Sequence, residues 1–438
     1  MIDFQALRNK ILDKAIRGEL VPQLESEPEV NQIGESPEEP PFDIPNKWKW
    51  IQVKALEAKR KTVCPISLNN DKVELWSIPA YDEGRAQIVS PSAIGSSKKI
   101  VSIGDVLLAK IVPHIKRSWV VTENRPEAPL IKLASTEWLI YQSDLFIPDF
   151  LVLLFKSPYF RNKMMKTISG MGSLKRTNPK ALSQVWLPLP PKEEQYRILS
   201  RVERLWIEID QMESAYKELL EISNQLRKKI LRKAIEGKLV PQLESEPKVE
   251  LRNEKESFNI PFEIPTKWKW TTLEQICLQI TDGEHKTPKY QKDGVPFLSV
   301  KDISSKKLNF SDTKFVSLED FDVIKKRCHP QKGDILLSKV GSTGIPAIVD
   351  TDKDFALFVS VALLKLNKLL VLDKFLWYLL QSPLVQKQAK ENTRGIGNKN
   401  WVLKAIKATI VPLPPIPEQR RIVDQLEKIF SSINSLSK

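Results

Sequence analysis

The chain has 438 residues, of which 41% are hydrophobic and 28% are charged, so it can hold two or three globular domains with ordinary cores. It has no run of 18 apolar residues and its first residues are polar, which argues against a membrane-spanning segment and a signal peptide. Its three cysteines are scattered along the sequence, which indicates reduced thiols in a cytoplasmic protein and neither a disulfide framework nor a metal site.

The first expected element is a helix near the N-terminus, and its sequence returns later in the chain. The segment from Leu7, LRNKILDKAIRGELVPQLESEPEV, is nearly repeated from Leu226 as LRKKILRKAIEGKLVPQLESEPKV. Repetition at such a long period indicates a duplicated architecture, and two copies are too few for a solenoid. Gly18 and its counterpart Gly237 are the expected helix stops. The first copy leads into a linker, residues 25–40, whose charged residues are all acidic.

Two similar modules are expected at residues 41–191 and 261–415. PFDIPNKWKW opens the first and PFEIPTKWKW the second, GDVLLAK in the first corresponds to GDILLSK in the second, and the ends match as LPLPPKEEQYRI and VPLPPIPEQRRI. Short apolar runs between turn residues indicate a mixed α+β fold in both. The sequence between these landmarks differs freely, which suggests two binding modules with different targets.

The alternation of Lys and Trp at the start of each module is typical of a half-buried strand. The four tryptophans could stack on bases, but packing at the boundary of the core is the favoured interpretation. They are Trp48, Trp50, Trp268 and Trp270.

The formal charge of +14 is concentrated on the modules. Residues 41–191 hold 22 Lys and Arg against 12 Asp and Glu, a net +10, and residues 261–415 hold 24 against 16, a net +8. Residues 192–236 between them hold 10 against 9. Two basic bodies joined by a nearly neutral element suggest a polyanion contacted at two places. An ordinary basic protein is the alternative.

Residues 192–237 are expected to form one helix of roughly 66 Å, with apolar residues in the 4,3 spacing of a coiled-coil seam. Alone it would leave this seam in water, so it needs a partner. The spacing recurs over residues 416–438, and the part that should follow by repetition stands at residues 7–18. We therefore predict that the second copy of the helix is split between the two chain ends. The expected seam residues are Ile198, Val202, Leu205, Ile209, Met212, Tyr216, Leu219, Ile422, Leu426, Ile429, Ile433 and Leu436.

The predicted fold is thus α+β, with two similar α/β domains separated by a pair of long antiparallel helices in a circular, pseudo-twofold repeat. The alternative is two independent helices that each cap their own module. The predicted boundaries are residues 1–24 (rear half of the split helix), 25–40 (acidic linker), 41–191 (first module), 192–237 (central helix), 238–260 (linker), 261–415 (second module) and 416–438 (front half of the split helix).

The order IP-x-x-W-x-W, GD-[VI]-LL-x-K, G-x-G and PLPP-x-x-EQ-x-x-I, found twice, resembles the specificity (S) subunit of Type I restriction–modification systems. The resemblance covers nearly the whole chain. It implies that each module is a target recognition domain for one half of a split DNA site. It further implies docking of two modification (M) subunits that carry S-adenosylmethionine and methylate adenine, and, in some systems, of restriction (R) subunits.

The second module carries a further match to recognition domains in TDGEHKTP, from Thr281, followed by GVPFL from Gly294. The first module has no clear counterpart over residues 59–77. A scaffold with two basic protein-binding modules remains the alternative function.

Catalysis by this chain is not expected. An adenine methyltransferase needs Asn or Asp before Pro-Pro-aromatic, whereas the nearest segment here has Glu39 in that position. The Gly-x-Gly pairs lack the flanking strand and helix of a nucleotide loop, and no Gly-x4-Gly-Lys-Ser/Thr motif is present. No cofactor is expected on this chain, and S-adenosylmethionine is expected on the M subunit.

Basic residues beside turns are the candidates for contacting DNA, where Lys and Arg neutralise phosphates and a few side chains read base edges. In the first module they are Lys98, Lys99, Lys110, Lys116, Arg117, Lys175 and Arg176. In the second they are Lys286, Lys289, Lys292, Lys306, Lys307, Lys339, Arg394 and Lys399.

Overall fold

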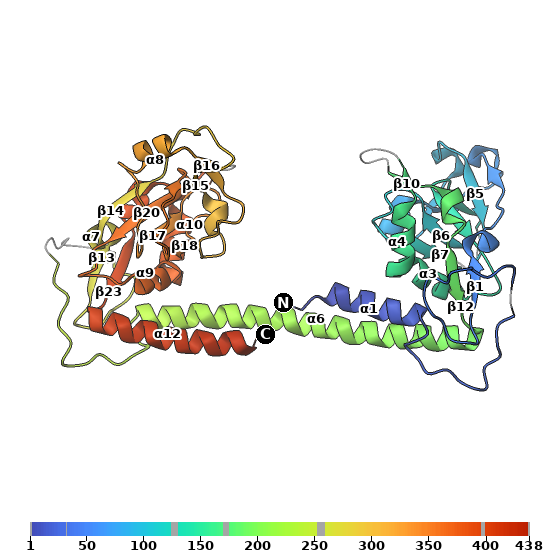
Figure 1. The fold of residues 1–438 in the computed structure, drawn as a ribbon, viewed down its shortest axis with the longest axis horizontal. Helices are drawn as coiled ribbons and strands as arrows, with labels where there is room; N and C mark the ends of the chain where they lie inside the picture. Colours follow the sequence, from blue (N-terminus) through green and yellow to red (C-terminus); the bar gives the residue numbers. More distant parts are fainter. Residues whose placement is uncertain are drawn as a thin grey trace. The chain divides into compact units, whose positions relative to one another are not determined.

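The computed structural model describes residues 2–31, 33–123, 130–169, 175–251, 259–395 and 399–436. The chain divides into two compact units, Met1–Ala215 and Tyr216–Lys438, and helix α6 (Lys192–Ile235) continues from the first into the second (Figure 1). Each unit holds one module of mixed helix and sheet and one half of α6. The predicted fold class is therefore confirmed. Among the residues described, no helix is both long and apolar enough to cross a membrane.

The first module contains a five-stranded sheet in the order β2-β5-β8-β3-β4 and a three-stranded sheet in the order β7-β6-β9. The strands are β2 (Thr62–Val63), β3 (Val73–Trp76), β4 (Gln87–Val89), β5 (Lys98–Val101), β6 (Val106–Ala109), β7 (Ser118–Val120), β8 (Lys132–Ser135) and β9 (Trp138–Tyr141). The helices are α2 (Ile78–Asp82), α3 (Pro148–Lys156), α4 (Pro158–Lys166) and α5 (Pro179–Leu182).

The second module contains a four-stranded sheet in the order β14-β20-β17-β18 and a three-stranded sheet in the order β16-β15-β19. The strands are β14 (Cys277–Asp282), β15 (Val295–Leu298), β16 (Lys314–Val316), β17 (Ile335–Ser338), β18 (Pro346–Ile348), β19 (Ala356–Leu357) and β20 (Val361–Leu366). The helices are α7 (Leu273–Ile276), α8 (Leu318–Ile324), α9 (Asp373–Leu380), α10 (Pro383–Asn392) and α11 (Leu403–Lys407).

The first and last strands of each module pair with each other in an antiparallel two-stranded ribbon. In the first module β1 (Lys49–Gln52) pairs with β12 (Trp186–Leu189), and in the second β13 (Lys269–Thr272) pairs with β23 (Ile410–Leu413). The repeated KWKW and PLPP segments are thus the two sides of one ribbon. Proline is tolerated there because each strand of a two-stranded ribbon has an open edge.

A helix from each chain end packs antiparallel on α6. In the first unit α1 (Phe4–Ile16) places Arg8 2.5 Å from Asp210, whereas Gln23, beyond α1, lies 2.5 Å from Glu194 (Figure 1). Going forward along α1 and the segment after it, the contacted residues of α6 have lower and lower numbers. The two helices therefore run in opposite directions.

The second unit repeats this arrangement with α12 (Ile416–Leu436). Arg421 near its start lies 2.7 Å from Glu246, which follows α6, and Asn434 near its end lies 2.5 Å from Arg227. In each unit, one half of the intact helix and one half of the split helix thus form an antiparallel pair.

The apolar seam is closed over most of its length. Ile198, Val202, Ile209, Ile422, Leu426 and Ile433 are buried, and Leu205, Tyr216, Leu219 and Ile429 are half-buried. The side chain of Leu436 lies outside the described part of the chain.

The prediction for Met212 is wrong, because its side chain is 52% exposed. At this level of the pair Arg8 of α1 bonds to Asp210 and Glu213. A helix has 3.6 residues per turn, so Met212 points away from both acids.

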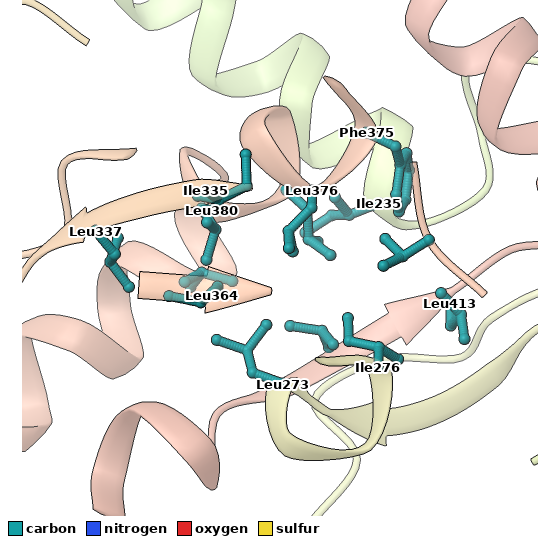
Figure 2. Packing of buried hydrophobic residues seen from close by; sticks show 14 of the residues in the cluster. Ile235, Leu273, Ile276, Ile335, Leu337, Leu364, Phe375, Leu376, Leu380 and Leu413 are labelled. Atoms are coloured by element: carbon teal, nitrogen blue, oxygen red, sulfur yellow. The ribbon is translucent and has the colours of Figure 1, made fainter. Parts of the chain in front are cut away.

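The second module and its helix pair share one hydrophobic core. Ile235 of α6 packs with Phe375 and Leu376 of α9 and with Leu413 of β23 (Figure 2). Ile422, Val423, Leu426, Phe430 and Ile433 of α12 belong to the same cluster. The module is therefore packed directly on the helices, with a continuous apolar interior.

Candidate nucleic-acid interface

Each GD motif is a tight turn that starts an inner strand of its sheet. The glycine has a φ of +88° in the first module and +90° in the second, a conformation that favours glycine. Asp105 accepts a hydrogen bond from the backbone N–H of Ser102 at 2.9 Å, and Asp334 accepts one from Gln331 at 2.8 Å. The turn leads into β6 or β17, and each strand is followed by a lysine, Lys110 or Lys339.

A short hairpin docks on the end of this strand in both modules. In the first module the N–H of Thr177, in the hairpin β10 (Ile168–Ser169) and β11 (Arg176–Thr177), donates to the carbonyl oxygen of Lys110 at 2.9 Å. In the second module the N–H of Trp401, in the hairpin β21 (Thr393–Arg394) and β22 (Asn400–Trp401), donates to that of Lys339 at 2.7 Å.

The hairpins bring exposed cations to equivalent places. The N–H of Val112 donates to the carbonyl oxygen of Lys175 at 3.1 Å, and the N–H of Gly341 donates to the carbonyl oxygen of Lys399 at 2.8 Å. Lys175 and Lys399 have exposed side chains. Gly170, Met171, Gly172, Ile396 and Gly397 of the predicted G-x-G segments lie outside the described residues.

At this edge of the first module two cations share one carboxylate. Glu137 lies 3.1 Å from the guanidinium of Arg176 and 3.9 Å from the ammonium of Lys110. Lys99 pairs with Ala134, three residues before Glu137, and burial and then the charge of Lys110 lower the pKa of its ammonium. One acid cannot balance these cations, so this edge is electropositive. Of the predicted residues, the structure brings Lys99, Lys110, Lys175 and Arg176 together.

The equivalent edge of the second module is built around the buried carboxylate of Asp282. It lies 2.9 Å from the ammonium of Lys339, 2.6 Å from the guanidinium of Arg327 and 3.1 Å from Nε2 of His285. Burial alone would raise the pKa of Asp282, but hydrogen bonds from Lys339 and His285 hold it below its ordinary value. A buried carboxylate needs such partners, so Asp282 fixes the cations around it.

Arg327 is a candidate that the sequence did not reveal. Its Nη2 donates to Oδ1 of Asp282 at 2.6 Å and to the carbonyl oxygens of Asp282 and Gly283 at 2.8 Å each. The side chain is nevertheless 50% exposed. Gly283 permits this loop to approach its neighbour, because a Cβ there would lie 2.1 Å from the carbonyl oxygen of Leu357. The result is a guanidinium held in place, half open to solvent.

Two predicted DNA contacts are contradicted by burial. Lys98 is 7% exposed, and its ammonium donates to the carbonyl oxygen of Ser96 at 2.9 Å and to its hydroxyl at 2.6 Å. Lys339 is 5% exposed and paired with Asp282. Both ammonium groups are therefore bonded to other residues of their own module.

The remaining candidates of the first module are engaged elsewhere. Arg117 makes two hydrogen bonds of 2.8 Å to Asp82, and the ammonium of Lys116 lies 3.4 Å from Asn9 of α1. The structure therefore places Lys116 at the corner between the module and the helices, apart from the hairpin.

The second module separates its candidates into two groups. Lys286, Lys289 and Lys292 are exposed in the loop that follows β14, and Arg394 is exposed in the hairpin. Lys306 and Lys307 lie elsewhere, in hollows that face α9 and the helices. Cys328 is buried, whereas the neighbouring His329 bonds to Asp354 at 3.1 Å.

The repeated tryptophans belong to the junction between each module and its helices. Nε1 of Trp48 donates to Glu194 at 2.8 Å, and Nε1 of Trp268 donates to Glu418 at 2.9 Å. Both acids are buried, and burial raises the pKa of each. These two tryptophans are therefore part of the packing, as favoured from the sequence, and Trp50 is also buried.

Repeated ion pairs hold the linker against the same junction. Arg197 lies 2.7 Å from Glu27, and Arg421 lies 2.7 Å from Glu246. The ammonium of Lys47 donates to three carbonyl oxygens of the first linker, and that of Lys267 to three of the second. The repeated residues thus build the scaffold, while the candidate interface differs between the modules.

Comparison with known proteins agrees with this architecture. Residues 265–438 match the family model described as the Type I restriction modification DNA specificity domain. The EcoBI specificity subunit of Escherichia coli is 28% identical over 61% of this chain and 56% of that subunit. The EcoAI specificity subunit of the same species is 24% identical over 98% and 89%, respectively. The chain thus spans little more than half of the first relative and most of the second.

Solved structures share the fold. The HsdS subunit from Thermoanaerobacter tengcongensis superposes with a TM-score of 0.57 at 20% identity, over 90% of this chain and 92% of that one. A chain from a structure on the assembly and conformational transition of the type I R-M system gives a TM-score of 0.63 at 20% identity, over 91% and 93%. The resemblance seen in the sequence is confirmed. Residues 265–438 thus carry a Type I restriction modification DNA specificity domain, and nearly the whole chain is similar to a Type I specificity subunit.

Proposed function

We propose that each module reads one half of a split sequence in duplex DNA and that the helices set the number of unread base pairs between the halves. The observation that carries the proposal is the electropositive edge at the end of the GD strand, present in both modules with different side chains. Arg176 and Lys110 share Glu137 in the first module, and Arg327 and His285 share Asp282 in the second. A common site with different side chains suits two different half-sites.

Arg327 is the residue to which we assign base reading in the second module. The side chain is half-exposed, and the hydrogen bonds that anchor it to Asp282 and Gly283 come from Nη2. An N–H of arginine can donate to O6 or N7 of guanine, two acceptors that the major groove exposes. The exposed lysines around it, Lys286 and Lys399, are suited to phosphates, which fix register and carry no sequence information.

The chemistry is assigned to partners. We propose that the chain docks two modification subunits, which carry S-adenosylmethionine and methylate adenine, and a restriction subunit where the system has one. The support is a surface that repeats although the modules differ: LVPQLESEP occurs at residues 20–28 and 239–247. Within it Leu24 is 39% exposed and Leu243 is 42% exposed. Two equal surfaces with an exposed leucine suit two copies of one partner.

Methylome mapping tests the proposal. Cells expressing the full chain with its modification partner should methylate a bipartite, asymmetric sequence. Arg327→Gln should relax one base pair in one half-site, at a cost of about 1–3 kcal/mol. Lys326→Gln is the matched control, since Lys326 is the exposed neighbour of Arg327.

Three outcomes would contradict it. Methylation of an unsplit sequence would contradict the bipartite reading, and changes in both half-sites of the Arg327 variant would contradict the division between modules. Binding of the complex to DNA that does not weaken with salt would favour a protein-binding scaffold, because phosphate contacts make affinity salt-dependent.

A further inference from the structure

A pocket of about 560 Å³ lies in the second unit, between the module and the helix pair. Its cations are Arg227 and Lys228 of α6 and Lys306 of the loop after β15. Amide, aromatic and aliphatic residues complete the wall, and no Asp or Glu lines it among the residues that the structure describes. Three cations without a lining carboxylate make this a pocket for an anion.

The duplication shows that this charge is a difference between the two units. In the first unit Arg8, the counterpart of Arg227, lies 2.5 Å from Asp210 and 3.0 Å from Glu213. In the second unit Arg227 donates over the same 2.5 Å to Oδ1 of Asn434, the counterpart of Asp210. An amide has replaced the carboxylate in unchanged geometry, so the charge of Arg227 is not neutralised by this contact.

Two further replacements act in the same direction. Lys228 of the second unit stands where the first unit has Asn9. The counterpart of Glu213 is Ser437, an uncharged residue that lies outside the described part of the chain. At this corner the first unit has Arg8 and Lys116 together with its two acids, whereas the second unit has lost both acids and carries Lys228 on the helix.

The cations are held in position before any ligand arrives. The guanidinium of Arg227 lies 4.9 Å from the centre of the Phe430 ring, and its Nη2 is bonded to Asn434. The ammonium of Lys306 is 2.8 Å from Oε1 of Gln381. Burial, and then the nearby charge of Arg227, lowers the pKa of Lys306. The two cations thus stand near each other.

A neighbouring hollow of about 710 Å³ serves as a contrast. It shares Lys306, Trp377 and Tyr378 with the pocket, but three carboxylates line it. One of them, Glu427, lies 2.7 Å from Lys374. Five lysines also line the hollow, so its carboxylates offset three of five positive charges, whereas among the described residues no lining carboxylate offsets the three cations of the 560 Å³ pocket.

We propose that this pocket, with Arg227, Lys228 and Lys306, binds a phosphate group, and that in the assembled complex this group belongs to the DNA backbone. The DNA source rests on the proposed function, whereas the phosphate chemistry does not. The helix α6 would then contribute a sequence-independent contact to DNA from the second unit only, in addition to acting as a spacer. A free nucleotide shares the chemistry and is the other source that the experiment separates.

The experiment uses three variants and one control in the full chain. Asn434→Asp supplies the acid that the first unit has, and Lys228→Gln and Lys306→Gln each remove a cation. Lys229→Gln is the control, because Lys229 is exposed on the same helix and does not line the pocket. Thermal melting of each variant establishes that it is folded.

Two measurements are made on each variant. The affinity of the complex with modification subunits for duplex DNA is measured against salt concentration, and inorganic phosphate and ATP are titrated into the full chain by calorimetry. Each of the three variants should lower the slope of log affinity against log salt by about 1, without altering the methylated sequence. The control should keep the wild-type slope.

The outcomes separate the sources and the proposals. A lowered slope in the three variants supports the DNA backbone, whereas an unchanged slope with lost ATP binding supports a free nucleotide. Wild-type slopes together with no phosphate or ATP binding by the wild-type chain would overturn the pocket. If the wild-type complex does not bind DNA at all, the proposed function fails, and the titrations with phosphate and ATP still test the pocket.

Discussion

At the scale of single residues, the two glycines that end the helices are constrained by close packing as well as by their backbone conformation. Gly18 has a φ of +73°, and a Cβ there would lie 2.3 Å from Cγ of Pro45. Gly237 repeats this with a φ of +68° and 2.3 Å to Pro265. The glycine thus ends the helix and also lets the module approach it. Gly84 has a similar φ of +77°, but nothing lies within 4 Å of its Cβ position.

This difference predicts the effect of adding a methyl group. Gly84→Ala should lower the free energy of unfolding by about 1 kcal/mol, since it suffers only the strain of a left-handed conformation. Gly18→Ala should lower it clearly more, because the methyl group also overlaps Pro45. Urea unfolding of both variants checks this. Equal losses would mean that the module shifts away from α1 at little cost.

Prediction from the sequence failed for the contacts of individual side chains. The ends of the GD strands were located from the sequence, but the state of Lys339 was not, because its partner Asp282 lies 57 residues away. Arg327 was missed for the same reason, since its contact with Asp282 spans 45 residues. Pairings of this kind depend on the packing of loops, which hydrophobic periodicity does not encode.

At the scale of elements, the helices were the most predictable part. The central helix was expected over residues 192–237 and is found at Lys192–Ile235. The heptad spacing identified Ile198, Val202 and Ile209 as buried, because a packed helix pair needs one continuous apolar face. Met212 fits the same spacing but is exposed, because polar contacts replace the seam where Arg8 meets α6.

A matched pair of variants tests whether the seam is closed at Ile209 and open at Met212. Ile209→Asp would bury a charge, and an uncompensated buried charge costs about 3–5 kcal/mol. Met212→Asp should cost less than about 1 kcal/mol, as exposed substitutions usually do. Each position has one glutamate four residues away on α6, Glu213 for Ile209 and Glu208 for Met212, so repulsion affects both variants to a similar degree. Urea unfolding gives the two costs, and similar values would contradict the packing described.

At the scale of the whole molecule, the duplication is the feature that made the architecture predictable. The repeat offsets located the first and last strands of each module. They also indicated that the two chain ends together make up one copy of the helix. The interiors of the modules were not predictable in the same way. The four-stranded sheet of the second module includes β14, whereas the equivalent edge of the first module has only the isolated bridge between Glu57 and Tyr141 among the residues described. Residues that the two copies do not share give no repeat signal.

The division between reading modules and a spacer helix predicts the result of lengthening α6. The two units meet between Ala215 and Tyr216, and Ala215 is exposed, so four helix-forming residues inserted after it should disturb neither core. They add roughly 6 Å, the length of about two base pairs. Methylome mapping should then show both half-sites unchanged and more unread base pairs between them. The same insertion after the exposed Ile33 in the linker should leave the spacing unaltered. A changed half-site sequence in the α6 variant would mean that the helix takes part in reading bases, because no module residue has been altered.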